Sequence, residues 1–447
     1  MKVTIVKTGI NGEGIAYVDH KPVFIPGAFP GEVAEIWITD REERFSRAKL
    51  IHILKPSPSR IPSPCVRSDA CGGCPLIELE YTAQLAEKRR LLCEALWKYG
   101  HVRESFVREV HGSEDALGYR SALKLPTAEE EGLLVTGMYR TGTNHFVSID
   151  TCPAHDPTLE AIRKTVLAII HEEHLPSYDQ GHGIRYLIMR RIDKQIAIAL
   201  ITGKDTLPES FLHKLSLLPE VESIVQSVNT AKTPIGLFGR ETRLLYGSNL
   251  IHISFAGFPI QLSAESFFQL NLKQAEALYQ MAVSKVDECH VLAEAYCGVG
   301  VMSLMAKDKA RKVYGIESVP QAIENAKANA KASRVPNVTF LCDDAAKGLE
   351  RLLNQTEVDI LLADPPRSGM DRAMLETIRN SSIQKIIYVS CNPATLGKNI
   401  HELKSEYDVK TVIPFDLFPN TPHVESVTVL VRRGHSDRRK GKRRNHA

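Results

Sequence analysis

Cys391 is a candidate nucleophile because of its place in the stretch "YVSCNPATL" (388–396). The apolar residues before it are typical of a buried strand, and a free cysteine at the end of such a strand is most often a small core residue. Asn392 and Pro393 end the strand immediately after Cys391, because proline cannot continue it. This break predicts that the sulfur lies at the edge of a sheet, where a thiolate could attack a bound ligand.

A second group of residues has the pattern of a nucleotide-binding loop. An apolar strand ends in "YCGVG" (296–300), and Gly298 and Gly300 allow a tight turn and a close approach of the backbone to a ligand. Glu317 ends the next apolar stretch, where a carboxylate can accept both hydroxyls of a ribose. Ser303 stands where a dinucleotide loop has its third glycine, so the pattern favours S-adenosylmethionine (SAM) over NAD and leaves NAD as the alternative.

Asp364 opens the stretch "DPPRSG" (364–369), which follows another apolar strand. The two prolines favour an extended turn without amide donors and hold Asp364 at the carboxyl end of the strand. A purely structural turn is the alternative interpretation. Because ligands of open α/β sheets bind at the carboxyl ends of the strands, Asp364 and Cys391 are expected beside the same ligand.

Four other cysteines have a spacing typical of a metal site. Cys65, Cys71 and Cys74 follow the pattern Cys-x5-Cys-x2-Cys, and Cys152 comes 78 residues later. Four thiolates suit either zinc or an iron–sulfur cluster, and the spacing alone does not separate the two. Unliganded buried thiols are the third possibility.

The chain must position these groups with several domains, since 447 residues exceed one compact core. Near-continuous apolar strands alternate with helices after about residue 260, which predicts a parallel sheet of doubly wound, Rossmann-like type. Short alternating strands at the N-terminus predict an OB-like β-barrel, and a helix is expected from about residue 77, closed by Gly100. The expected regions are a β-barrel at 1–55, a linker with the cysteine cluster at 56–76, an α+β central domain at 77–260, an α/β nucleotide-binding domain at 261–433 and a basic disordered tail at 434–447.

Composition adds bounds on the partners and the compartment. The net charge is +3, but the last 16 residues carry eight Lys or Arg against one Asp, a tail that either binds a polyanion or is simply solvated. No apolar stretch suggests a signal peptide or a membrane span, so we expect a cytoplasmic protein that is not bound to a membrane. In that reducing compartment nine cysteines do not indicate disulfides.

Several motifs together resemble one family. "DPPRSG", "VSCNPATL" and "TPHVESV" occur in this order, and "YRSALKLP", "GMYRTGTNHFVSIDTCP", "GIRYLIMRR" and "ESFFQLN" precede them. The set is similar to the RNA uracil-5 methyltransferases, which make 5-methyluridine with SAM, and the likeness runs from residue 1 to about 433. The N-terminal barrel resembles the TRAM RNA-binding module of the members that modify ribosomal RNA.

The resemblance implies roles for individual residues. Cys391 matches the family's nucleophile and Glu425 its proton-abstracting base, while Gln269, Tyr296, Glu317 and Asp364 match its SAM contacts. This pair fits the reaction, because a thiolate must add to uracil carbon-6 before carbon-5 can take a methyl group, and a carboxylate must then remove the carbon-5 proton. Glu294-Ala295 and Val301 depart from the usual cofactor loop of the family.

The resemblance also implies the cofactors and the substrate. Cys65, Cys71, Cys74 and Cys152 match the ligands of a [4Fe-4S] cluster in the iron–sulfur members, for which we expect a structural or RNA-shaping role. We therefore predict a monomeric, SAM-dependent methyltransferase acting on a uridine of 23S ribosomal RNA. A transfer-RNA uridine-5 methyltransferase is the first alternative, and a non-catalytic RNA-binding or assembly protein is the second.

Overall fold

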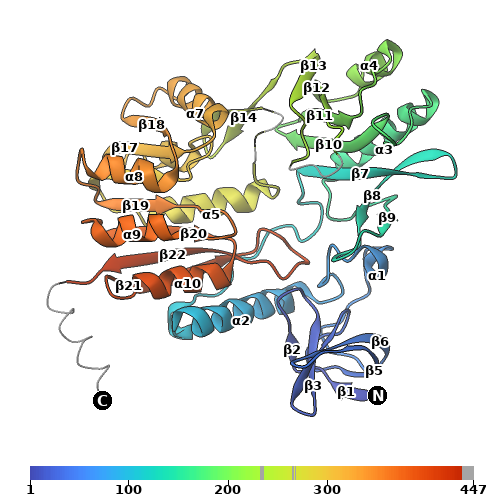
Figure 1. Ribbon diagram of the computed structural model, residues 1–447, viewed down its shortest axis with the longest axis horizontal. Helices are drawn as coiled ribbons and strands as arrows, with labels where there is room; N and C mark the ends of the chain where they lie inside the picture. The colour runs from blue at the N-terminus through green and yellow to red at the C-terminus, as the bar shows by residue number, and fades with distance from the viewer. Residues whose placement is uncertain (232–235, 264–265, 267, 435–447) are drawn as a thin grey trace.

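The computed structural model describes residues 1–231, 236–263, 266 and 268–434. Three large sheets, together with a short hairpin, organise the chain (Figure 1). Within these residues no helix is both long enough and apolar enough to cross a membrane. The predicted basic tail lies, apart from Gly434, outside the described residues.

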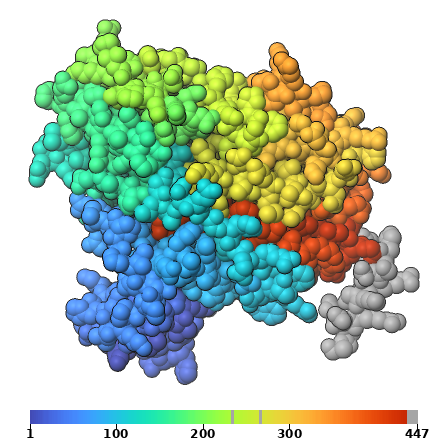
Figure 2. All heavy atoms as spheres, turned by 180° about the vertical axis from the view of Figure 1, so that it is seen from behind, coloured from blue at the N-terminus to red at the C-terminus, as the bar shows by residue number. Residues whose placement is uncertain are grey.

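The N-terminal sheet has six strands in the order β1-β5-β6-β4-β3-β2. Its strands are β1 (Lys2–Thr4), β2 (Lys7–Thr8), β3 (Gly14–Val18), β4 (Lys21–Ile25), β5 (Val33–Arg41) and β6 (Ser46–Lys55). Register shifts between β5 and β6 mark bulges, which bend the sheet so that Ile5, Val23 and Ile36 share one small core. The sheet projects from the rest of the molecule as a separate lobe (Figure 2).

Two helices follow this lobe, α1 (Ser68–Cys71) and α2 (Tyr81–Gly100). The buried face of α2 packs on a helix of the C-terminal sheet, α10 (Pro393–Leu403), and Leu92 and Leu96 join the core of that sheet. The helix ends at Gly100, as predicted, but the residue in the left-handed conformation is the next one, His101, with φ 53°. A Cβ atom on Gly100 would lie 2.9 Å from the carbonyl oxygen of Gly397, so the close crossing of the two helices explains this glycine.

The central sheet has seven strands in the order β13-β12-β11-β10-β7-β8-β9. They are β7 (Ala122–Glu130), β8 (Leu133–Tyr139), β9 (Phe146–Ser148), β10 (Ile184–Ile192), β11 (Gln195–Thr202), β12 (Val221–Val228) and β13 (Glu241–Gly247). The pairs are antiparallel except β11 with β12. Helices α3 (Pro157–Glu172) and α4 (Glu209–Ser216) pack their apolar faces on this sheet, and a hairpin of β14 (Leu250–Phe255) and β15 (Phe258–Ser263) leads to the C-terminal sheet.

The C-terminal sheet has the order β18-β17-β16-β19-β20-β22-β21, and only β22 runs antiparallel to its neighbours. Its strands are β16 (Cys289–Ala295), β17 (Ala310–Glu317), β18 (Val338–Cys342), β19 (Ile360–Ala363), β20 (Lys385–Ser390), β21 (Tyr407–Phe415) and β22 (Glu425–Arg432). The further helices are α5 (Leu272–Ser284), α6 (Val301–Met305), α7 (Pro320–Ala332), α8 (Ala345–Leu353) and α9 (Arg372–Asn380). The central strands are buried on both faces, as the apolar sequence predicts.

Polar residues at the carboxyl ends of these strands start the next helices. Asn392 accepts hydrogen bonds from the amides of Ala394 and Thr395 and so caps α10. Asp344 and Asp371 cap α8 and α9 in the same way. Each cap satisfies backbone donors that a helix start leaves free, so the chain reverses direction directly at the sheet edge.

Candidate functional site

The predicted site residues meet at the carboxyl edge of the C-terminal sheet. One level of the sheet is set by the pairs Ala295–Ile316, Ala295–Ala363 and Ala363–Tyr388. Glu317, Tyr296 and Asp364 come one residue further along their strands, so they leave the sheet side by side. This is the edge at which open α/β sheets bind their ligands.

The register of β20 and β22 brings Cys391 and Glu425 to the same place. Ser390 pairs with Ser426 in this antiparallel pair. One step beyond the pair, Cys391 leaves β20 opposite Glu425, which begins β22. Residues 34 positions apart in the chain are therefore neighbours only because β22 inserts between β20 and β21.

Cys391 is half-buried, and its surroundings disfavour the thiolate. Burial raises the pKa of the Cys391 thiol to about 11, and the negative charges of Glu425 and Asp364 act in the same direction. The guanidinium of Arg367 opposes them and lowers the pKa. Among the described residues, Arg367 of the "DPPRSG" stretch is thus a cation whose charge favours the thiolate of Cys391. The sequence alone did not indicate this role for Arg367.

Two carboxyl groups beside Cys391 also have raised pKa values. Glu425 is 6% exposed, and burial together with the charge of Asp364 raises its pKa to about 8, against the charge of Arg367. Burial raises the pKa of Asp364 to about 7. Strongly perturbed acids gathered at one sheet edge are typical of catalytic sites.

Gln269 reaches this edge from the segment before α5. Its Nε2 donates to the hydroxyl of Tyr279 over 3.4 Å. Burial raises the pKa of Tyr279, and so does the charge of Asp364, which places the phenol among the acids of the site. The sequence predicted Gln269, but it gave no signal for Tyr279, which lies on a helix of ordinary amphipathic pattern.

The loop after β16 has the conformation of a ligand cradle. Tyr296, Gly298 and Gly300 have φ of 64°, 53° and 83°, in the left-handed region. A Cβ atom on Gly298 would meet nothing within 4 Å, so space is open above the loop, whereas one on Gly300 would lie 2.5 Å from the ring of Phe340. Gly298 therefore borders open space, and Gly300 packs closely against the sheet.

The carboxylate of Glu317 is held by backbone amides. It accepts hydrogen bonds from Gly298 at 3.2 Å, from Ser318 at 2.8 Å and from Val319 at 3.0 Å. Oε1 already accepts from the amides of Ser318 and Val319 and from the Ser318 hydroxyl, whereas Oε2 accepts only from Gly298 among the described residues. Oε2 therefore has acceptor capacity left for a ribose hydroxyl. The open loop and this fixed acceptor fit the ribose of SAM.

Glu294, one of the departures from the usual loop, lies beneath it. Its side chain is fully buried and accepts a hydrogen bond from the hydroxyl of Ser303. Burial raises the pKa of Glu294 to about 8. The hydrogen bond joins β16 to α6, so Glu294 and Ser303 support the loop of residues 296–300 from below.

The four cysteines of the predicted cluster share one region of the structure. Cys71 is the last residue of α1, Cys65 and Cys74 lie on either side of that helix, and Cys152 lies in the loop before α3. Burial raises the pKa of Cys65, and the charges of Cys152 and Cys71 add to this effect. Thr141 donates to the carbonyl of Gly72 over 3.1 Å, which ties the α1 region to the central sheet.

Two side chains make the environment of the cysteines uneven. Burial raises the pKa of Cys74 to about 12, although the charge of Arg120 opposes the rise. Burial would also raise the pKa of Cys152, but the hydrogen bond and charge of His155, the amide of Ala154 and the charge of Arg120 together outweigh it and lower the pKa. No three His, Cys, Asp or Glu side chains in the described part of the chain are arranged so that they could hold a metal ion. The [4Fe-4S] cluster thus stays a prediction.

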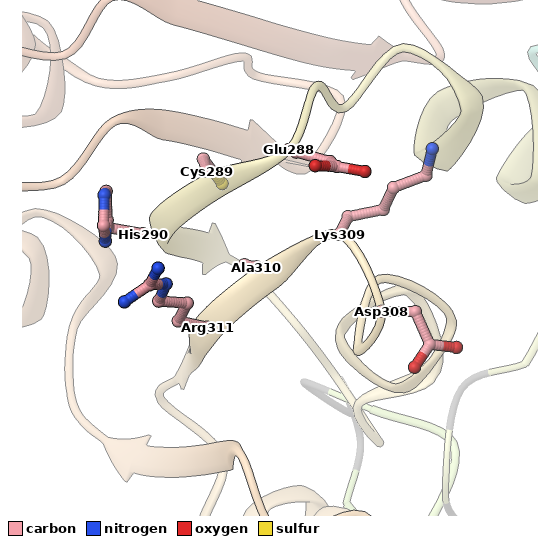
Figure 3. Close-up of a pocket in the computed structure, with 7 residues that line it drawn as sticks. All are labelled: Glu288, Cys289, His290, Asp308, Lys309, Ala310 and Arg311. Carbon is pink, nitrogen blue, oxygen red and sulfur yellow. The ribbon is translucent and has the colours of Figure 1, made fainter.

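A surface hollow lies at the opposite edge of the same sheet, at the start of β16 and β17 (Figure 3). It is lined by Glu288, Cys289, His290, Asp308, Lys309, Ala310 and Arg311. The amino ends of parallel strands are not the ligand edge of this fold. None of the predicted site residues lines this hollow.

Comparisons with known proteins identify the family of this chain. The tRNA (uracil-5-)-methyltransferase family model matches residues 80–433, and the TRAM domain model matches residues 1–51. An RNA methyltransferase of Halalkalibacterium halodurans is 37% identical over 97% of this chain and 96% of its own length. One from Listeria innocua is 35% identical over 96% of this chain and 97% of its own.

A solved structure has the same fold over nearly the whole chain. It is the tRNA (uracil-54, C5)-methyltransferase of Pyrococcus abyssi in complex with S-adenosyl-L-homocysteine. The likeness has a TM-score of 0.78 with 24% identity, and covers 96% of this chain and 100% of that one. The chain therefore belongs to the tRNA (uracil-5-)-methyltransferase family of SAM-dependent RNA methyltransferases, and it carries a TRAM domain at its N-terminus.

Proposed function

We propose that this enzyme methylates carbon-5 of a specific uridine in 23S ribosomal RNA, with Cys391 as the nucleophile and Glu425 as the base. The observation that carries the proposal is the pairing of Ser390 with Ser426, which sets the half-buried thiol opposite a buried carboxyl group. A pair of this kind is what the reaction requires. We further propose that the target base is flipped out of its stack to reach the edge of the sheet.

The proposed reaction begins with the sulfur of Cys391. Its thiolate adds to carbon-6 of uracil, and the electron pair of the carbon-5–carbon-6 bond moves into the ring as an enolate. Carbon-5 then takes the methyl group that SAM supplies, and the electron pair of the broken sulfur–methyl bond stays on the sulfur, which leaves as S-adenosylhomocysteine. Arg367 favours the thiolate against the charges of Glu425 and Asp364, which supports its participation in this first step.

Glu425 completes the reaction in this proposal. Its carboxylate removes the carbon-5 proton, the released electron pair restores the carbon-5–carbon-6 double bond, and the bond from carbon-6 to sulfur breaks. The electron pair of that bond returns to Cys391 as thiolate. A pKa of about 8 suits a base that works near neutral pH, because such a group is a stronger base than an ordinary glutamate.

We assign the binding of SAM to the residues at the carboxyl edge, on the support of their geometry. Glu317 would accept the ribose hydroxyls, and the open side of Gly298 would face the ligand. The other residues of this assignment are Gln269, Tyr296, Gly300 and Asp364. Replacing Glu317 by Gln is expected to raise the dissociation constant for SAM, measured by calorimetry, while the same change at Glu288 in the distant hollow leaves it unaltered.

Covalent trapping tests the chemistry. RNA that contains 5-fluorouridine cannot lose a proton from carbon-5, so with SAM it should remain attached to the wild-type enzyme on a denaturing gel. Cys391→Ala should abolish the attachment, and Cys289→Ala, at the opposite edge of the sheet, should retain it. Equal attachment to wild type and Cys391→Ala would exclude Cys391 as the nucleophile.

The choice of ribosomal RNA rests on the N-terminal TRAM domain and the four grouped cysteines. A transfer-RNA substrate is the second candidate, and one observation favours it. The Pyrococcus abyssi transfer-RNA enzyme has the fold of this chain along its full length, so possession of the N-terminal region does not exclude transfer RNA. Mapping 5-methyluridine by mass spectrometry in both RNA pools, with and without the gene, decides between them. Loss from transfer RNA alone would refute the ribosomal assignment.

We also propose that Cys65, Cys71, Cys74 and Cys152 hold a [4Fe-4S] cluster. The proposal is supported by the electrostatic coupling of the four thiols, since the charges of neighbouring cysteines raise the pKa of Cys65 and of Cys74. Protein purified without oxygen should contain iron and acid-labile sulfide and absorb visible light. Colourless protein with one zinc ion would refute the cluster in favour of the alternative metal.

The remaining proposals concern the setting of the enzyme. We propose that it acts as a monomer in the cytoplasm, with the TRAM domain and the basic tail contributing to RNA affinity. Counterion release makes such binding salt-dependent. Light scattering with and without RNA measures the mass of the complex, and a dimer would contradict the proposed monomer.

A further inference from the structure

Residues 416–424 connect β21 to β22 and lead directly into Glu425. Side chains that belong to neither strand hold much of this connection. They come from α2, which lies about 330 residues earlier in the chain and beside β21 and α10 in space (Figure 1). The segment that leads to Glu425, the proposed base, is therefore held by a helix outside the C-terminal sheet.

Lys88 makes the central contact between α2 and this connection. Its ammonium pairs with Asp416, and both side chains are completely buried, with 0% exposure. The same ammonium donates to the carbonyl of Phe418 over 3.0 Å, so one cation holds two points of the connection. The other carboxylate oxygen of Asp416 accepts from the hydroxyl of Tyr81 at 3.0 Å.

Gln84 makes a second contact one turn earlier on the same helix. Its Nε2 donates to the side chain of Asn420 over 3.0 Å, and its Oε1 accepts from the amide of Asn420 over 2.8 Å. Asn420 has φ 66°, in the left-handed region, and this double contact holds it there. The carbonyl of Asn420 also accepts from the amide of Leu76, over 3.0 Å.

Stability alone does not explain a fully buried ion pair. Removing two charges from water costs about as much as their attraction returns, and an apolar pair of similar volume is often as stable or more so. An ion pair differs from an apolar contact because its hydrogen bonds are directional. They favour one arrangement of the two side chains, whereas an apolar contact allows many. We therefore assign the Lys88–Asp416 pair to fixing the backbone conformation of residues 416–424, rather than to adding stability.

We propose that Lys88 is a positioning residue for proton abstraction, holding residues 416–424 so that Glu425 faces the base attached to Cys391. The inference rests on the proposed function, in which Glu425 takes the carbon-5 proton. The addition of Cys391 and the methyl transfer do not use Glu425. Loss of the contact therefore slows only the last step, and RNA that is methylated but still attached to Cys391 accumulates.

The experiment separates the two steps with ordinary, unfluorinated RNA. In rapid-quench mixing, the covalent complex is followed on denaturing gels, and proton removal is followed by tritium release from RNA labelled at carbon-5. Lys88→Met should form the complex as fast as wild type and resolve it about 100-fold more slowly, the loss that a shift of about 1 Å in a catalytic group causes. Mass spectrometry should find the added methyl group in the accumulated complex.

Two further variants keep the result clear if Lys88→Met unfolds. The pair Lys88→Met with Asp416→Asn leaves no unpaired buried charge and should show the same selective loss. Tyr81→Phe removes one hydrogen bond to Asp416 and leaves the ion pair, so it should show a smaller loss in the same step.

Arg432→Met is the matched control. Arg432 is a cation like Lys88, but it lies at the end of β22 far from Glu425 and binds the carbonyls of Ile383 and Ser381, each at 2.7 Å. Replacing Arg432 should either leave the rates of complex formation and resolution unchanged or slow both by the same factor.

Parallel slowing of both steps in the paired variant, or no slowing, overturns the positioning role of Lys88. Glu425→Gln distinguishes this from failure of the proposed function. If Glu425→Gln accumulates the complex and the Lys88 variants do not, only the positioning role is lost. If Glu425→Gln turns over like wild type, the proposed base is wrong and the role of Lys88 falls with it.

Discussion

The dependence of the two chemical steps on pH follows from the unequal pKa values of Cys391 and Glu425. Both groups react in their deprotonated forms, so both steps should speed up as the pH rises. With a pKa of about 8, Glu425 is roughly a tenth ionised at pH 7 and roughly nine-tenths ionised at pH 9. Resolution of the covalent complex should therefore rise about tenfold across this interval and then level off.

Formation of the complex should behave differently. The thiol of Cys391 has a pKa of about 11, so its thiolate fraction rises about tenfold for each pH unit and does not level off below pH 10. At pH 8 the thiolate fraction is only about one in a thousand by the same relation. The two steps should thus have breaks about three pH units apart.

The assay is the rapid-quench measurement of both steps from about pH 6.5 to about pH 10 with saturating SAM. Arg367→Gln serves as the perturbation, because its positive charge lowers the pKa of both Cys391 and Glu425. Since Arg367 is exposed and solvent screens it, the break in resolution should move up by about half a unit to one unit, and the rate of complex formation at any one pH should fall. Resolution that is independent of pH between 7 and 9, about one unit either side of the break, would refute the assignment of a raised pKa to a catalytic Glu425.

Three shorter predictions concern the parts that support the site. Arg60→Gln leaves the fully buried Glu32 without its partner at 2.7 Å and should destabilise the N-terminal lobe by about 3 kcal/mol, seen as an earlier calorimetric transition; an unchanged transition would contradict this. Gly397→Val places atoms within 3.0 Å of the Cβ of Tyr99, and should cost about 1–3 kcal/mol of stability in denaturant unfolding, where a neutral effect would disprove the tight crossing. Cys74→Ser should lower the iron content of protein purified without oxygen, and equal iron in both proteins would remove Cys74 from the ligand set.

Local sequence was sufficient for the parts of the site that each depend on one strand and its following turn. Tyr296, Asp364 and Cys391 each follow an apolar stretch and precede a turn, and each leaves the same edge of the sheet. The physical reason is that a buried parallel strand needs a continuous apolar run, and its end is where polar residues and helix caps begin. The TRAM domain and the methyltransferase family were also recognisable from motifs in the chain.

Contacts between distant segments were decided only by the tertiary structure. The sequence predicted a strand near Glu425, but only the insertion of β22 between β20 and β21 sets it opposite Cys391. Gly100 had the pattern of a helix end, yet its small size is required where α2 crosses α10 at Gly397. The residue that carries the left-handed conformation is its neighbour His101.

For the ionisable groups of the site, too, some properties follow from the sequence and others from the tertiary structure. The sequence by itself determined which groups can ionise, namely the thiol of Cys391, the carboxyl of Glu425 and the ammonium of Lys88. Their pKa values and partners depend on how far each is buried and on which charges lie nearby, and both depend on the packing of segments hundreds of residues apart. The proposed chemistry was therefore readable from residue types and spacing, whereas the position of Glu425 and the charges around Cys391 were decided by the fold.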